Sequence, residues 1–127
     1  MYRVIVVDDE PAALVLLCSI IKKKCPDYQV VATAENGREG LEKVDELLPD
    51  LVISDVSMPI MNGIQLVSAI KEKHPEMLSL IVSGYSEFEY ARAALQSGVC
   101  DYILKPVIPS EMKKTLDRIG EKIRGYH

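Results

Sequence analysis

The sequence predicts an α/β fold in which helices cover both faces of a parallel sheet. Short apolar runs alternate five times with helix-length amphipathic segments, and the connections between them are short. The run at residues 4–7 is apolar without interruption, which is typical of a parallel strand buried on both faces. Strands and helices that alternate in this way favour right-handed crossovers within one sheet. The 127 residues, 48% of them hydrophobic, are expected to form one domain over residues 1–127.

The predicted strands are short runs rich in apolar and β-branched residues. They lie at residues 4–7, 28–33, 51–53, 78–82 and 101–104. The third run delivers Asp55 at the carboxyl end of its strand. Ligands of open parallel sheets bind beyond the carboxyl ends of the strands, so the residues after each run are the candidates for a functional site.

The first two predicted helices have recognisable ends. Pro11 is tolerated in a first helical turn, and Pro26 marks the end of that helix. Asn36 is the expected N-cap of the second helix, with the acidic residue Glu39 three positions later. The apolar faces are expected to carry Leu14, Leu17, Cys18 and Ile21 in the first helix, and Leu41, Val44 and Leu48 in the second.

Three more helices are predicted in the second half of the chain. One begins at Gly63 and ends before Pro75, because a proline disfavours helical backbone in the residue before it. Another has a capping box at residues 86–89, continues through Leu95 and has Gly98 as its C-cap. The last helix carries Met112, Leu116, Ile119 and Ile123 on one face.

Polar residues that suit one chemistry follow four of the predicted strands. They are Asp8, Asp9 and Glu10 after the first strand, Asp55 after the third, Ser83 and Gly84 after the fourth, and Lys105 after the fifth. Neighbouring carboxylates repel one another, and a hard divalent cation such as Mg²⁺ relieves that repulsion through oxygen ligands. A lysine and a hydroxyl beside the cation would complete a cradle for a phosphoryl group.

Each of these residues alone has an ordinary structural explanation. Asp9 by itself would be interpreted as a turn or helix cap, Ser83 as part of a turn, and Lys105 as a solvated side chain. Their combination at the ends of four strands of one small domain favours a shared site.

Composition excludes several other classes of function. The formal net charge of −4 offers no basic face for nucleic acid, so this segment is not expected to bind DNA directly. Cys18, Cys25 and Cys100 lack the paired spacing of a zinc site and are expected to be free thiols in a reducing cytoplasm. No apolar run approaches the ~20 residues that span a bilayer, and no signal-peptide pattern is present. We therefore expect a cytoplasmic protein without membrane contact.

Five segments together resemble the receiver domain of two-component response regulators from end to end. They are VVDDEP at residues 6–11, DLVISD at 50–55, MPIMNG at 58–63, Ser83-Gly84, and DYILKP at 101–106. The resemblance implies a flavodoxin-like (βα)5 three-layer sandwich with a parallel sheet of strand order 2-1-3-4-5. It also implies a signalling domain that catalyses only its own phosphorylation and autodephosphorylation, and no enzyme acting on external substrates.

The resemblance assigns metal and phosphoryl roles by position. Asp55 would be the phosphoacceptor. Asp9, Asp55 and the backbone carbonyl of Ser57 would bind Mg²⁺ directly, whereas Asp8 would act through a metal-bound water. Lys105 would pair with the phosphoryl charge.

The resemblance also implies a switch. Ser83 would bond a phosphoryl oxygen, and Tyr102 is similar to the family's switch aromatic, which turns inward when the Ser83 hydroxyl moves toward the phosphate. The bond between Lys105 and Pro106 resembles one that the family holds in the cis form. A sensor histidine kinase would donate the phosphoryl group.

Phosphorylation would then change the face made by the helix at residues 86–95, the strand at 101–104 and the last helix. A homodimer could form through this face. The segment SGYSEFEYA at residues 83–91 resembles receivers joined to AraC-type DNA-binding domains, so a transcriptional output through a domain outside these residues is expected. The alternative is a stand-alone receiver that acts by protein–protein interaction.

Three other classes of protein share some of these features. An aspartyl phosphohydrolase would carry a second Asp two residues after the first, whereas Asp8 and Asp9 are adjacent. A flavodoxin-type cofactor module would need a Ser/Thr/Gly-rich phosphate loop after the first strand, where this chain has acids. A degenerate receiver would lack Asp9, Asp55 or Lys105, and all three are present.

Overall fold

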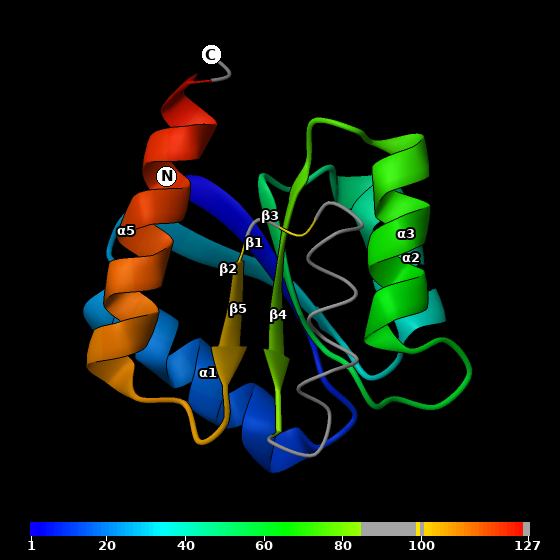
Figure 1. The fold of residues 1–127 in the computed structure, drawn as a ribbon, viewed down its shortest axis with the longest axis horizontal. Coiled ribbons are helices and arrows are strands. Elements are labelled where there is room, and N and C mark those ends of the chain that lie inside the picture. Colours follow the sequence, from blue (N-terminus) through cyan, green and yellow to red (C-terminus); the bar gives the residue numbers. More distant parts are fainter. Residues whose placement is uncertain (85–98, 100, 126–127) are drawn as a thin grey trace.

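Five parallel strands form the centre of the computed structural model (Figure 1). They are β1 (Tyr2–Val7), β2 (Tyr28–Ala34), β3 (Leu51–Asp55), β4 (Leu78–Ser83) and β5 (Asp101–Leu104). Their spatial order is β2-β1-β3-β4-β5, and every neighbouring pair is parallel. The predicted α/β class and the strand order 2-1-3-4-5 are therefore confirmed.

The structure describes residues 1–84, 99 and 101–125. The predicted helix at residues 86–95, its Gly98 cap and Cys100 lie outside these ranges, as does most of the segment at 83–91 that resembles AraC-type receivers.

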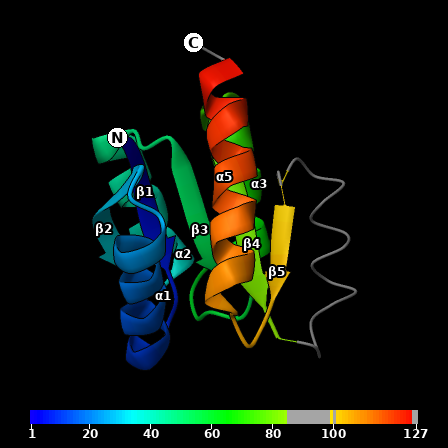
Figure 2. The same cartoon turned by 90° about the vertical axis from the view of Figure 1, so that its left-hand side faces the viewer.

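Four described helices cover the sheet on both faces. α1 (Pro11–Lys24) and α5 (Pro109–Gly125) lie on one face, while α2 (Gly37–Leu47) and α3 (Gly63–Lys73) lie on the other (Figures 1 and 2). In the described part of the chain, no helix is both long enough and apolar enough to cross a membrane.

Alternation along β1 divides the core between the two faces. Val4 and Val6 belong to the cluster formed with α1 and α5, whereas Ile5 and Val7 belong to the cluster formed with α2 and α3. Successive side chains of a strand point to opposite faces, so a strand covered on both faces needs apolar residues at every position. All four side chains are fully buried, as the uninterrupted apolar run predicted.

Most predicted helix ends are confirmed. Pro11 lies in the first turn of α1, and the Asn36 side chain accepts a hydrogen bond from the Glu39 backbone N–H at 2.9 Å. The prediction did not include the capping box of α3, in which the Asn62 side chain accepts from the Gln65 N–H and the Gln65 side chain accepts from the Asn62 N–H.

The predicted position of Leu48 on the apolar face of α2 is wrong. α2 ends at Leu47, and Leu48 follows in the left-handed region with a φ of 49° and a side chain that is 59% exposed. The Arg3 guanidinium of β1 donates to the carbonyl oxygens of Leu47 and Leu48 at 2.5 and 3.4 Å. Pro49 follows Leu48 and disfavours helical backbone there, so a local stop signal of the kind seen at Pro75 was overlooked. The contact with Arg3 then satisfies the last carbonyls of the helix.

Candidate functional site

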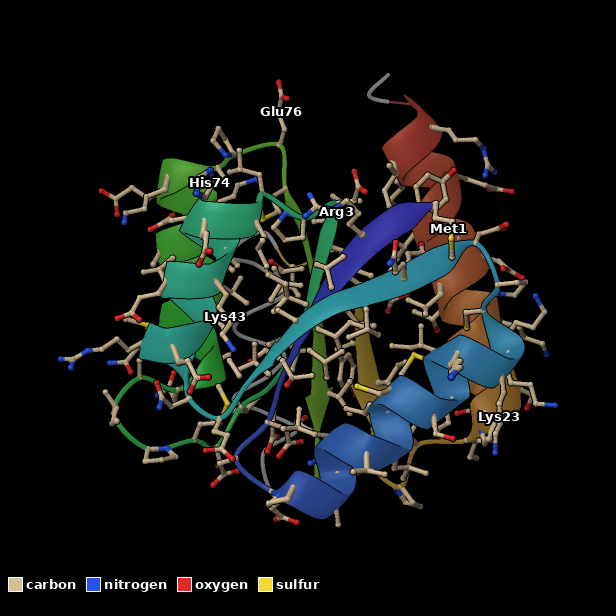
Figure 3. All side chains as sticks on the ribbon, turned by 180° about the vertical axis from the view of Figure 1, so that it is seen from behind. Met1, Arg3, Lys23, Lys43, His74 and Glu76 are labelled. Atoms are coloured by element: carbon tan, nitrogen blue, oxygen red, sulfur yellow. The ribbon has the colours of Figure 1, made fainter. Side chains whose placement is uncertain are left out.

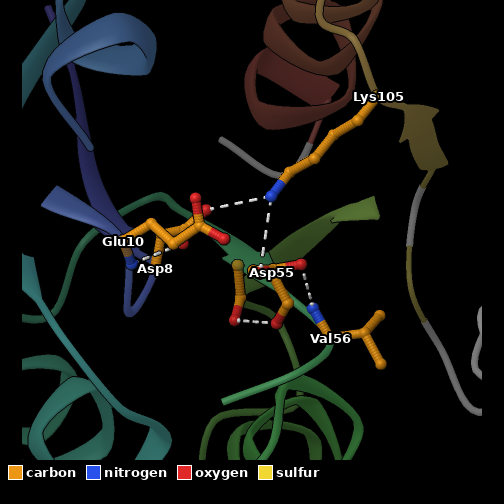
Figure 4. A network of polar contacts seen from close by, with 6 residues as sticks. Asp8, Glu10, Asp55, Val56 and Lys105 are labelled. Carbon is orange, nitrogen blue, oxygen red and sulfur yellow. Dashed lines mark hydrogen bonds and ion pairs between the residues drawn. The ribbon is translucent and has the colours of Figure 1, made fainter. Parts of the chain in front are cut away.

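The carboxyl ends of the strands bring the predicted site residues together (Figure 4). Asp8 directly follows β1, Asp55 is the last residue of β3, and Lys105 directly follows β5. Asp8 and Asp55 are 0% and 6% exposed, whereas Asp9 is exposed at the rim. The expected convergence of these groups at one edge of the sheet is confirmed.

Close backbone contacts hold the loop after β3 against the site. The Gly63 N–H donates to the Val56 carbonyl at 2.8 Å, and a Cβ at Gly63 would overlap the Asp55 carbonyl oxygen. The Gly37 N–H donates to the Met61 carbonyl at 2.9 Å, where a Cβ would again overlap backbone. Two glycines therefore permit the approach that holds the loop after Asp55 in place.

Three carboxylates share a small volume. Oxygen atoms of Asp8, Asp9 and Asp55 all lie within 4.8 Å of one another. Lys105 Nζ lies 3.3 Å from Asp8 Oδ2 and 3.4 Å from Asp55 Oδ2 (Figure 4). One ammonium faces three carboxylates, so the site has an excess of negative charge that a divalent cation could neutralise.

Burial and charge set the protonation of the site. Burial raises the pKa of Asp55 to about 6, an effect that Lys105 opposes and the Asp8 carboxylate reinforces. For Lys105, burial favours the neutral amine, but the Asp55 and Asp8 carboxylates outweigh it and raise the pKa. A carboxylate that resists ionisation in this way would ionise more readily beside a bound cation.

Backbone hydrogen bonds orient the two buried carboxylates. The Val56 N–H donates to Asp55 Oδ1 at 2.8 Å, and the Glu10 N–H donates to Asp8 Oδ1 at 3.0 Å. In each case the other oxygen, Oδ2, faces Lys105. The backbone thus holds Asp55 Oδ1, whereas Asp55 Oδ2 contacts the Lys105 ammonium.

Ser83 ends β4 as a fully buried residue, and its Oγ has no hydrogen-bond partner in the described part of the chain. Native proteins rarely leave a buried hydroxyl unpaired, so such a group calls for an explanation. The Lys105 N–H donates to the Ser83 carbonyl at 2.7 Å, which places the hydroxyl residue next to the start of the loop after β5.

Tyr102, Ser57 and Pro106 are the remaining residues to which the resemblance gave a role or a conformation. Tyr102 is half-buried and packs against the cluster of Val56, Val67, Ile81 and Val99, next to the Asp55 segment. Ser57 is exposed in the loop after β3, and the use of its carbonyl as a ligand stays a prediction. The peptide bond between Lys105 and Pro106 is cis, as the resemblance implied.

Sequence reasoning missed an apolar recess beside the site. It has a volume of about 270 Å³ and is lined by Leu16, Leu17, Pro106 and Val107, with Glu10 and Lys105 at its charged margin. Val15 and Leu16 of α1 are 70% and 51% exposed. The sequence feature that could have indicated this surface is that both residues are apolar although they lie outside the buried face of α1.

Comparison with known proteins gives a consistent result. The family model described as "Response regulator receiver domain" matches residues 4–117. The chain is 34% identical over 124 residues to the uncharacterized transcriptional regulatory protein YesN of Bacillus subtilis, covering 98% of this chain and 34% of that protein. It is 35% identical over 119 residues to the chemotaxis protein CheY of Thermotoga maritima, covering 94% and 98% of the two chains.

Solved structures agree with these sequence relatives. The REC domain of AraT, a response regulator from Geobacillus stearothermophilus, superposes with a TM-score of 0.92 at 34% identity and covers 98% of this chain and 97% of that chain. The chain spans about a third of YesN and 46% of the transcriptional regulatory protein HptR of Staphylococcus aureus.

Proposed function

The chain belongs to the family of response regulator receiver domains, and we propose that within it Asp55 accepts a phosphoryl group in a Mg²⁺-dependent reaction. The observation that carries the proposal is the buried Asp55 carboxylate, which stands beside two further aspartates and Lys105. Receiver domains are signalling domains, so no turnover of an external substrate is proposed.

The donor set fits a hard divalent cation. Asp9 and Asp55 would bind Mg²⁺ directly, Asp8 would act through water, and the Ser57 carbonyl would complete the protein ligands. Mg²⁺ favours one or two carboxylates, several waters and a phosphate oxygen, which suits a cluster with one exposed and two buried carboxylates. When bound, the ion neutralises charge on the transferring phosphoryl oxygens.

Asp55 Oδ2 is the nucleophile in the proposed transfer. The new bond joins this oxygen to phosphorus while the bond from phosphorus to the donor nitrogen breaks, and the leaving nitrogen keeps the electron pair. The Val56 N–H holds Oδ1 and so fixes the direction of Oδ2. Lys105 Nζ, 3.4 Å from Oδ2, is close enough to move onto a phosphoryl oxygen.

Ser83 and Tyr102 would convert the new charge into a change of shape. A phosphoryl oxygen would give the Ser83 hydroxyl the partner that the described residues do not supply. Movement of Ser83 toward it would open space for Tyr102 next to the Val56 cluster. A ligand shifts such an equilibrium only through its differential affinity for the two states. Ser83→Ala should therefore keep phosphorylation but weaken the switch.

A sensor histidine kinase is the proposed phosphoryl donor. The apolar recess, lined in part by the exposed Leu16, lies beside the site, where a protein presenting phosphohistidine would make contact. The proposed output is transcription through an AraC-type domain, supported by relatives that are transcriptional regulators and are longer than this chain. The alternative is a stand-alone receiver, because the chain matches CheY of Thermotoga maritima over nearly the full length of that protein.

The test is intact mass after incubation with acetyl phosphate, with and without Mg²⁺. We expect a single phosphoryl adduct that requires Mg²⁺ and is missing from Asp55→Asn. Asp117→Asn, which removes an exposed carboxylate from α5, is the matched control and should still form the adduct. A folded protein that forms no adduct, or one that forms it equally in Asp55→Asn, would contradict the proposal.

A further inference from the structure

Ser54 is a polar residue in an otherwise apolar part of the sheet. It precedes Asp55 in β3 and is 1% exposed. Residues 51–53 before it are apolar and fully buried, as are its neighbours in the sheet register, Val7 of β1 and Ile81 of β4. Burying a hydroxyl costs free energy unless it is hydrogen-bonded, and an apolar side chain would avoid that cost. The Ser54 hydroxyl therefore calls for a role beyond filling space.

The Ser54 hydroxyl contacts the peptide group that joins Asp55 to Val56. Its Oγ donates to the Asp55 carbonyl at 2.8 Å. The N–H of the same peptide group, which belongs to Val56, donates to Asp55 Oδ1 at 2.8 Å (Figure 4). A trans peptide group is planar, and its C=O and N–H point in opposite directions, so a bond that fixes the oxygen also fixes the N–H. One rigid group thus links the Ser54 hydroxyl to the Asp55 carboxylate.

Sheet pairing ends at this point of β3. The pairing with β1 ends at Ser54, and the pairing with β4 ends at Asp55. The Val56 N–H donates to a side chain, and the Val56 carbonyl accepts from the Gly63 N–H at 2.8 Å. The peptide group after Asp55 lies where the ladder stops, so a further donor to its carbonyl restricts its rotation.

We propose that Ser54 is a positioning residue for phosphoryl transfer to Asp55 and acts through the peptide group between Asp55 and Val56. This role rests on the proposed function, in which Asp55 Oδ2 attacks phosphorus. By limiting the rotation of the group whose N–H holds Oδ1, Ser54 keeps Oδ2 on the side of Lys105, 3.4 Å from Nζ. A nucleophile that is already held in its reactive direction reacts faster than one that must first be oriented.

The rate of adduct formation with acetyl phosphate tests this role, at Mg²⁺ concentrations raised until the rate no longer increases. Saturation with Mg²⁺ ensures that a slower reaction does not reflect weaker binding of the ion. Ser54→Ala should react about fivefold more slowly than wild type, which corresponds to the loss of one neutral hydrogen bond. Ser79→Ala is the matched control, because it removes another buried serine, near the start of β4, and should react like wild type.

A second pair of variants separates the hydroxyl from packing. Ser54→Thr and Ser54→Val have nearly the same shape and add the same bulk to the core, but only the first keeps a hydroxyl. Ser54→Thr should therefore react about fivefold faster than Ser54→Val, whatever the added bulk costs both of them.

Amide hydrogen exchange gives a measurement that does not depend on the reaction. In the unphosphorylated protein without Mg²⁺, protection of the Val56 amide should fall roughly fivefold in Ser54→Ala and stay unchanged in Ser79→Ala. The Ile53 amide, inside β3, should keep its protection in both variants.

The outcomes distinguish this role from the proposed function. A wild type that forms the adduct, together with equal rates for wild type and Ser54→Ala or for Ser54→Thr and Ser54→Val, overturns the positioning role and leaves the proposed function standing. Equal slowing in Ser79→Ala overturns it as well. A wild type that forms no adduct contradicts the proposed function, and unchanged Val56 protection in Ser54→Ala then overturns the link from Ser54 to the Asp55 carboxylate.

Discussion

The two ends of the sheet differ in how fully their described polar groups are paired. At the carboxyl end, three aspartates face one lysine, and the buried Ser83 hydroxyl has no partner among the described residues. At the amino end, by contrast, Arg3 both donates its N–H to Asp50 at 2.8 Å and caps α2 through its guanidinium.

Charges at the amino end also come in opposite pairs. The Asp45 carboxylate contacts His74 Nε2 at 2.8 Å and Lys73 Nζ at 3.1 Å, which ties α2 to α3 (Figure 3 labels His74 and Arg3). The hydrogen bond from His74 and the charge of Lys73 lower the pKa of Asp45. The amino end therefore contributes to stability, whereas the described residues of the carboxyl end leave a hydroxyl and an excess of negative charge for the proposed phosphoryl group and cation to satisfy.

The largest expected effect comes from Asp55→Asn, measured by urea unfolding in EDTA from pH 4 to 8. The folded protein holds the Asp55 proton more tightly than the unfolded chain, because its pKa is raised to about 6 from 3.8. Stability from this group is therefore highest below the unfolded pKa and falls as pH rises through about 6. Asp55→Asn should remove that decline and add roughly 2–3 kcal/mol at neutral pH.

Asp45→Asn, at the amino end of the sheet, should change the pH dependence of stability in the opposite direction. Because the pKa of Asp45 is lowered in the folded protein, its carboxylate stabilises the fold above the unfolded pKa, and this stability is lost as pH falls. Asp45→Asn should therefore lower the free energy of unfolding at neutral pH and make that free energy depend less on pH under acidic conditions. For Asp55, a free energy of unfolding that falls equally with pH in wild type and in Asp55→Asn between pH 4 and 6 would contradict this contrast between the two ends.

Arg3→Ala should lower the free energy of unfolding by about 2 kcal/mol, because the final carbonyls of α2 lose a charged donor. Arg3→Met keeps most of the stem and should lose nearly as much, which separates hydrogen bonding from packing. Both variants should still form the Asp55 phosphoryl adduct with acetyl phosphate. Loss of the adduct in a folded Arg3 variant would show that the two ends are not independent.

The smallest effects come from relieving backbone strain at each end with the same substitution. Leu48 and Ile60 have φ of 49° and 70°, and their side chains are 59% and 69% exposed. Leu48→Gly and Ile60→Gly should each stabilise the fold by about 1 kcal/mol, the second by more because Ile is β-branched. The alanine variants keep a Cβ and should gain little, and equal gains for Ala and Gly would rule out strain as the cause.

Much of the carboxyl end was predictable because strand ends converge in any parallel sheet. Asp8, Asp55 and Lys105 could be placed together from the apolar runs before them. The amino end was not predictable, since its main contact joins Arg3 to Leu47 across 44 positions. The Asn62–Gln65 capping box was local and could have been found from its residue types.

The strand-and-helix alternation, the buried faces of β1 and the polar residues at the strand ends follow from the amino-acid sequence alone. Local propensity and periodicity are properties of short segments, and a short segment carries them whatever surrounds it. Tertiary contacts, by contrast, bring Arg3 to the last carbonyls of α2, place Lys43 against the Thr33 carbonyl and raise the pKa of Asp55 through burial. These features depend on which distant groups meet and how much water they exclude, and no single segment contains that information.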